Sequence, residues 1–267
     1  MRVLFVGDIV GRPGRRAVRE VLPRLRERWA PDVVVANAEN AAGGFGLSRK
    51  VAAELFEMGA DVLTTGNHVW DKREAIEFIE GQPRILRPAN YPDGVPGRGM
   101  CRFELGDGRA LWVLNLQGRV LMPPVDCPFR RADALLSTIP EGERCVLVDM
   151  HAEATSEKRA MGFYLDGRAS VVVGTHTHVP TADAEVLPGG TGYLTDAGMT
   201  GPYASVIGMQ VEDSLQRLLT GMPRILNVAK GDARAAGLFA ELDDEAGRCL
   251  RVESFVEKVS GEDASRG

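Results

Sequence analysis

The sequence predicts a mixed α/β fold, in which two β-sheets pack as a sandwich flanked by helices. Between residues 2 and 80, short apolar runs of strand length alternate with helical patterns. This alternation indicates parallel strands joined by right-handed crossovers. A Gly-Asp-Gly turn later in the chain and two strands near its end indicate antiparallel pairing as well. A simple doubly wound fold is the alternative.

The first part of the chain contains three predicted strands, each followed by a helical segment. Ser48 is a candidate N-cap, because its hydroxyl can accept a hydrogen bond from the first turn of a helix. Gly59 then suits the end of that helix, since glycine tolerates the left-handed backbone common there. Strands are predicted at 2–6, 32–36 and 61–65, and helices at 13–29, 48–58 and 74–80.

The rest of the chain completes a single domain over residues 1–267. Residues 84–100 are rich in Pro, Gly and Arg, which indicates a loop or insertion. The turn at 106–108 joins two strands of a predicted hairpin. Further strands are predicted at 101–105, 110–116, 145–149, 170–174, 192–195, 238–242 and 249–256, the last three antiparallel, and helices at 157–165 and 211–220; the polar end at 260–267 is expected to fray.

The composition is that of a soluble globular protein, with 44% hydrophobic and 26% charged residues. The formal net charge is −5, and the sequence has no clustered basic stripe, so tight RNA binding is not indicated. Positive charge for phosphate binding would have to be local, and bound metal ions are one source.

The sequence predicts a cytoplasmic protein, because it shows no recognisable targeting signal and its cysteines are scattered. The four cysteines are scattered without a C-x-x-C pair, which argues against a zinc cage or disulfide framework and fits a reducing compartment. The N-terminus lacks the long apolar core of a signal peptide. No apolar stretch approaches the roughly 20 residues that span a bilayer, so no membrane association is expected.

Polar residues suited to metal binding or proton transfer follow five of the predicted strands. In open α/β sheets, ligands collect outside the carboxyl ends of the strands. Carboxylate, amide and imidazole groups suit divalent transition metals, and two such ions can clamp a phosphoryl group and activate water. These residues are Asp8, Glu39, Asn40, Asn67, His68, His151, His176 and His178.

Each of these residues also has an ordinary structural interpretation. Asp8 can cap the following helix, Glu39-Asn40 can form a polar turn, and a lone His151 is more often a satisfied or exposed histidine than a ligand. His176 and His178 are a stronger pair, because alternate residues of an extended segment point to the same side. All four histidines of the chain lie at predicted strand ends, and this joint pattern favours a dinuclear metal site.

These motifs resemble the signature of calcineurin-like metallophosphoesterases. The resemblance rests on Gly7-Asp8, Gly66-Asn67-His68, a lone His151 and the G-T-H-T-H motif at 174–178. The sequence departs from that signature twice, since Asp8-Ile9-Val10 lacks the histidine and Glu39-Asn40 replaces an aspartate motif. In both departures it resembles a narrower family. That family is the bacterial 2′,3′-cyclic-nucleotide 2′-phosphodiesterases, which the chain resembles from end to end.

The resemblance implies a fold, a ligand set and a reaction. Asp8, Glu39, Asn40 and His178 would hold one metal ion, and Glu39, Asn67, His151 and His176 the other. Glu39 would bridge the two ions, which in this type of family are iron or manganese, and His68 would be the proton donor. The substrate would be a small phosphodiester, a 2′,3′-cyclic nucleotide cleaved at the 2′ ester to a 3′-nucleotide.

Other functions stay open at this stage. The same metal site would serve a phosphomonoesterase or nucleotidase, and a metal-binding regulatory protein is the non-enzymatic alternative. Substrate-binding residues are not identified, and a homo-oligomer is compatible with the sequence. Three arginines near the start of the first helix are secondary candidates for phosphate binding: Arg12, Arg15 and Arg16. Phe45 is a candidate for stacking on a base. The loop at 195–202 is expected near the site, without an assigned role.

Overall fold

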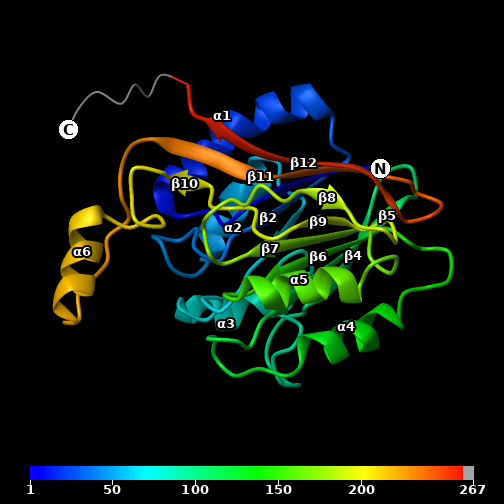
Figure 1. The fold of residues 1–267 in the computed structure, drawn as a ribbon, viewed down its shortest axis with the longest axis horizontal. Coiled ribbons are helices and arrows are strands. Elements are labelled where there is room, and N and C mark those ends of the chain that lie inside the picture. Colours follow the sequence, from blue (N-terminus) through cyan, green and yellow to red (C-terminus); the bar gives the residue numbers. More distant parts are fainter. Residues whose placement is uncertain (261–267) are drawn as a thin grey trace.

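A computed structural model describes residues 1–260, and of the polar end expected to fray, residues 261–267 lie outside this range. The described residues form two six-stranded sheets packed face to face, with helices on both outer sides (Figure 1). The first sheet has the order β12 (Cys249–Lys258), β11 (Ala233–Leu242), β1 (Arg2–Val6), β2 (Val33–Asn37) and β3 (Val62–Thr64), with β10 (Gly201–Pro202) beside the start of β11. The second sheet has the order β4 (Met100–Glu104), β5 (Ala110–Gln117), β6 (Val146–His151), β7 (Val171–Thr175), β9 (Gly192–Leu194) and β8 (Glu185–Val186).

Strand directions confirm the mixed sandwich and exclude a simple doubly wound sheet. β1, β2 and β3 are parallel, as the βαβ order predicts, and so are β5, β6, β7 and β9. Antiparallel partners complete both sheets, including the predicted β4–β5 hairpin and the β11–β12 pair. The strand at 192–195, which we expected to be antiparallel, is β9. It is antiparallel to the two-residue β8 but parallel to its other neighbour, β7.

Helices cover the outer face of each sheet. In Figure 1, α1 lies over the first sheet, α4 and α5 lie under the second, and α6 projects from one end of the molecule. None of the helices in residues 1–260 combines the length and apolar composition that crossing a membrane requires. The helices are α1 (Gly11–Trp29), α2 (Arg49–Glu57), α3 (Arg73–Phe78) with a 3₁₀ turn at Ile79–Gly81, α4 (Pro128–Leu136), α5 (Thr155–Tyr164) and α6 (Val211–Thr220).

Alternation along the strands divides the core into three layers. Val3 and Phe5 of β1 point between the sheets, whereas Leu4 and Val6 pack against α1 and α2. This is the period-two pattern of a strand buried on both faces. A third layer lies between the second sheet and helices α4 and α5, where Val148 and Met150 of β6 pack.

Several helix boundaries differ by one or two residues from the prediction, and one helix was not predicted. α1 begins at Gly11 rather than Pro13, and its N-cap is Val10, so Asp8 does not cap it. α4 was not predicted, although Ala132 on this helix is buried and Phe129, Leu135 and Leu136 pack against the third core layer.

The segment at 84–100 carries the chain from the first sheet to the second. Before Met100, where β4 begins, it forms isolated bridges rather than strands, pairing Ile85 with Leu63 and Leu86 with Arg98. Ile85 and Leu86 are fully buried. This loop is therefore fixed to the core along part of its length.

Replacing Ser48 with Ala should lower the free energy of unfolding by about 1 kcal/mol, the usual cost of losing an N-cap. The Ser48 hydroxyl accepts a hydrogen bond from the Val51 amide at 3.2 Å at the start of α2. Urea unfolding measures the effect, and Ser48→Asp, which keeps an acceptor, should retain the stability. Equal stability of the Ala and Asp variants would contradict the capping role.

Candidate metal centre

At one end of the sandwich, the layer between the two sheets changes from apolar to polar. Five strands place apolar side chains in this layer and then a polar residue two positions later, near their carboxyl ends. Because alternate strand residues share a face, the polar side chains from both sheets meet there. They are Asn37, Thr64, Asn115, Asp149 and Thr175, all fully buried.

The carboxylate of Asp149 joins the two sheets at this point. Its Oδ2 accepts hydrogen bonds from the Asn37 amide at 3.0 Å and the Thr64 hydroxyl at 2.5 Å, both on the first sheet. Its Oδ1 accepts from the Thr175 hydroxyl at 2.7 Å on the neighbouring strand β7. Burial raises the pKa of Asp149, although the charge of His151 and these hydrogen bonds oppose the shift.

This hydrogen-bond network fixes the orientation of His151. The Thr175 hydroxyl gives its proton to Asp149, so it accepts the Nδ1–H of His151, whose Nδ1 lies 2.8 Å away. In the neutral ring, the lone pair of His151 is then on Nε2, which points into the site. A histidine held in this way by its other ring nitrogen is typical of metal ligands.

Three acceptor atoms lie around His151 Nε2. His151 Nε2 lies 3.0 Å from Asn67 Oδ1, 3.1 Å from Glu39 Oε1 and 3.1 Å from His176 Nδ1. The other ring nitrogen of His176, Nε2, lies 3.2 Å from Glu153 Oε2 and can donate to it. When both rings are neutral, their lone pairs point at the same place, where a proton or a metal ion can satisfy them.

A second group of donors lies beside the first and shares Glu39 with it. The His178 Nδ1–H donates to the Ile207 carbonyl at 2.8 Å, which leaves Nε2 to face the site. Nε2 lies 3.9 Å from Asp8 Oδ1 and 3.1 Å from the Asn40 side-chain nitrogen. The ligand atoms of Asp8, Glu39 and His178 lie within 4.8 Å of one another, as do those of Glu39, His151 and His176.

The polar atoms in these groups fit metal ions. Asp8 Oδ1 and Asn40 Oδ1 are buried without a hydrogen-bond partner among the described residues, which is costly unless a cation satisfies them. Burial raises the pKa of Asp8 to about 7, against the opposing charges of His178 and His151. A buried carboxylate with an unpaired oxygen beside imidazole rings is a site that binds positive charge, from a protonated histidine or from a metal ion.

Burial and neighbouring charges also shift the pKa values of two histidines and of Glu39. Burial would lower the pKa of His151, but the Glu39 charge and hydrogen bond, with the Asp8 charge, raise it to about 9. Burial lowers the pKa of His176 to about 3, and the charge of His151 adds to the shift. Burial would raise the pKa of Glu39, but His151, His68 and His176 lower it to about 2. The carboxylates thus hold positive charge at the centre of the group.

The G-T-H-T-H segment has a different backbone from the extended one that we predicted. His176 and His178 have positive φ values of 99° and 66°, and their side chains enter different groups instead of pointing to one side together. Such a backbone is unfavourable for histidine and must be held by its surroundings. The Asp8 carboxylate accepts the His176 N–H at 3.2 Å, so one carboxylate both anchors the loop and faces the site.

Asp196 holds the middle of that segment. Its Oδ2 accepts from the Thr177 N–H at 3.2 Å and hydroxyl at 2.7 Å, and its Oδ1 accepts from the Gly198 N–H at 2.8 Å. Lys158 of α5, also buried, pairs with the same carboxylate at 2.6 Å. The loop at 195–202, to which the sequence assigned no role, thus positions the two histidines.

His68 lies next to Glu39 but points differently from the other histidines. Its backbone N–H donates to Glu39 Oε2 at 3.2 Å, while its ring Nδ1 lies 2.8 Å from Asp71 Oδ2. Its side chain is 29% exposed and lines the cavity over the metal centre. Phe45 packs edge-on against the ring, with centroids 5.1 Å apart.

The structure brings together all eight residues that the sequence selected, and it adds four others. Asp149 was recognisable in principle as the one charged residue in an apolar strand, and Glu153 by its closeness to His151. Asp196 lay in a loop already singled out. Lys158 gave no signal, because a lysine in a helical pattern is normally exposed; it is 1% exposed here.

The two-sheet α/β fold, with a carboxylate shared by two histidine-containing groups at the strand ends, is that of a calcineurin-like metallophosphoesterase in which Glu39 stands in place of the usual aspartate. Within that class, the chain belongs to the family of YmdB-like proteins, whose model matches residues 4–255. It is 47% identical over 256 residues to the 2′,3′-cyclic-nucleotide 2′-phosphodiesterase of Bacillus subtilis (strain 168), covering 96% of this chain and 97% of that protein.

Two solved structures have the same fold along nearly the whole chain. A hypothetical protein from Thermus thermophilus is 48% identical with a TM-score of 0.90, covering 97% of this chain and 100% of that one. A protein described as a novel phosphatase from Mycoplasma pneumoniae is 32% identical with a TM-score of 0.90, covering 97% and 93%. These relatives confirm the fold and the family resemblance found in the sequence.

Replacing Gly66 with Ala should abolish metal binding at the group containing His151. An added Cβ would lie 2.2 Å from the His151 ring and 2.3 Å from Glu39 Oε2, so both ligands would have to move. Metal analysis of the purified variant should show loss of at least one of two ions per chain. Gly106→Ala is the control, because a Cβ there meets nothing within 4 Å; two retained ions in both variants would contradict the geometry.

Replacing Asp196 with Ala should cost about 3–5 kcal/mol of stability, because it leaves Lys158 buried and unpaired. It should also weaken metal binding through the loss of the Thr177 anchor. Asp196→Ala/Lys158→Met removes the unpaired charge, so chemical unfolding should show regained stability while metal titration still shows weak binding. Full recovery of metal affinity in the double variant would show that Asp196 does not position the histidines.

Proposed function

We propose that this protein is a dinuclear-metal phosphodiesterase that hydrolyses 2′,3′-cyclic nucleotides to 3′-nucleotides. The observation that carries the proposal is the position of Glu39, whose ligand atoms lie within 4.8 Å of both histidine-containing groups. A carboxylate shared in this way suits two ions held close together for phosphoryl chemistry. The similarity to the 2′,3′-cyclic-nucleotide 2′-phosphodiesterase of Bacillus subtilis supports the choice of substrate.

The proposed ligand sets follow the two groups of donors. Asp8, Glu39, Asn40 and His178 hold one ion, and Glu39, Asn67, His151 and His176 hold the other. The mixture of nitrogen and oxygen donors without thiolate suits iron or manganese. When bound, the ions supply Lewis acidity, which lowers the pKa of the attacking water and offsets charge on the phosphoryl oxygens. A cytoplasmic location is part of the proposal, and the four free cysteines support it.

His68 is the proposed proton donor to the leaving oxygen. Asp71 accepts from Nδ1 and orients the ring, so Nε2 is the nitrogen left for the substrate. The water oxygen forms a bond to phosphorus as the bond from phosphorus to the ribose O2′ breaks. The proton from His68 goes to O2′, and the product keeps its phosphate on O3′.

A phosphomonoesterase is the second candidate, because one solved relative is described as a phosphatase. The donor groups fit phosphoryl transfer in general and do not select the leaving group. A panel of 2′,3′-cyclic nucleotides and 3′- and 5′-monoesters with added Mn or Fe separates the two functions. Rapid turnover of monoesters with inert cyclic nucleotides would favour the phosphomonoesterase.

Replacing His68 with Ala should lower kcat on 2′,3′-cyclic nucleotides by about 10²–10⁴-fold, the usual contribution of a general acid. Metal content should stay at two ions, because the ring is not among the proposed ligands. On a bis-aryl phosphate, whose phenolate leaves without a proton, the loss of kcat should be much smaller. A loss of equal size on both substrates would contradict the role as proton donor.

A further inference from the structure

A second hollow adjoins the cavity over the metal centre. The metal-centre cavity has a volume of about 520 Å³, and the adjoining hollow has about 1080 Å³. Phe45, Arg217 and Leu226 line both, so the two spaces are connected. Drug-sized ligands occupy roughly 300–1,000 Å³, so the metal-centre cavity alone accommodates one nucleotide. The hollow provides more room than a mononucleotide substrate requires.

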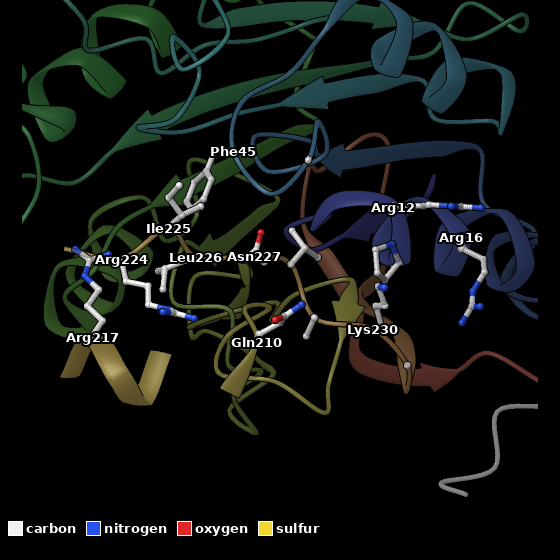
Figure 2. A pocket seen from close by; sticks show the side chains of 15 residues that line it. Arg12, Arg16, Phe45, Gln210, Arg217, Arg224, Ile225, Leu226, Asn227 and Lys230 are labelled. Atoms are coloured by element: carbon white, nitrogen blue, oxygen red, sulfur yellow. The ribbon is translucent and has the colours of Figure 1, made fainter. Parts of the chain in front are cut away.

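The hollow is strongly basic in an otherwise acidic protein. Figure 2 shows Arg217 and Arg224 at the α6 end and Arg12, Arg16 and Lys230 at the other, with Gln210 and Asn227 between them. None of the described residues that line it is acidic. Its lining cations come from the start of α1 and from the segment around α6, which are distant in sequence. The fold therefore assembles a basic surface that no sequence stripe could reveal.

Several of these cations are available to a ligand. The side chains of Arg12, Arg217 and Lys230 are exposed and form no ion pair or hydrogen bond within residues 1–260. Arg224 is held by Asp213 at 2.8 Å, which fixes its place at the α6 end. Exposed, unpaired cations that follow a groove are the usual means of binding a nucleic-acid backbone.

We propose that the substrate is an RNA chain that ends in a 2′,3′-cyclic phosphate, with its upstream nucleotides in this basic groove. The proposal rests on the proposed function and extends it from a mononucleotide to the end of a chain. A 2′,3′-cyclic phosphate occupies both O2′ and O3′ of the terminal ribose, so the chain can continue only from its 5′ oxygen. The chain therefore leaves the metal centre on its 5′ side and enters the groove past Phe45.

The composition of the groove favours a single strand of RNA. Cations along a groove bind phosphates, and an aromatic side chain stacks on an unpaired base without regard to sequence. Phe45, half-buried at the junction of the two spaces, offers such a ring beside His68. DNA lacks the 2′ oxygen and cannot form the cyclic end. RNA cleavage in which a 2′-hydroxyl attacks the adjacent phosphodiester would supply this substrate.

The reaction at the chain end is the one proposed for the mononucleotide. One water is consumed, its oxygen bonds to phosphorus, and the bond from phosphorus to O2′ breaks. The proton from His68 goes to O2′, leaving a free 2′-hydroxyl and a 3′-phosphate on the RNA. No oxidant or second substrate is required.

The test compares oligoribonucleotides of one, two, four and six residues, each ending in a 2′,3′-cyclic phosphate. In the wild-type protein at low salt, kcat/KM should rise about tenfold or more from one residue to six, and the gain should shrink with added salt. In Arg12→Ala/Lys230→Ala, most of that gain should be lost. Arg130→Ala/Arg248→Ala removes two exposed charges that do not line the groove and should keep the gain.

The possible results separate this proposal from the proposed function. Equal kcat/KM at every length would overturn the RNA substrate and leave a mononucleotide phosphodiesterase. A gain with length that persists unchanged in Arg12→Ala/Lys230→Ala would overturn the role of the groove. Failure to cleave any cyclic phosphate, mononucleotide or chain end, would overturn both proposals.

Discussion

The buried carboxylate of Asp149 is the constraint on which the metal centre depends. It lies where the inter-sheet layer ends, and it accepts hydrogen bonds from both sheets. A buried carboxylate is unfavourable unless its lone pairs are satisfied, so the two sheet edges are held in one relative position. Through Thr175, the same carboxylate sets the tautomer of His151 and thereby the direction of its lone pair. The metal-binding geometry is thus a consequence of how the sandwich closes.

Much of the fold and most of the site follow from local sequence patterns. Strand and helix periodicity predicts β1 to β3 and the antiparallel pairs, because each pattern depends on neighbours within a few residues. The candidate ligands are recognisable since each follows an apolar strand. The left-handed backbone at His176 and the buried Lys158 are not predictable in this way. The backbone at His176 is held by Asp8 and, through Thr177, by Asp196, and Lys158 pairs with Asp196; long-range packing sets these contacts.

The basic groove shows the same limit of sequence reasoning. A net charge of −5 correctly describes the whole molecule, but it says nothing about how cations are distributed on the surface. The fold brings the start of α1 and the segment after α6 to one hollow next to Glu39. In the proposed RNA complex, phosphate groups away from the metal centre would be bound by these few cations, although the net charge of the molecule is negative.

In the proposed metal centre, Glu39 would contact both metal ions. Anomalous diffraction from crystals of the protein purified with its metal, measured at the absorption edge of that metal, can locate each ion. If Glu39 is shared, two peaks should lie about 3.5–4 Å apart, both in contact with the Glu39 carboxylate. A single peak, or two peaks of which one lies out of contact with Glu39, would contradict it.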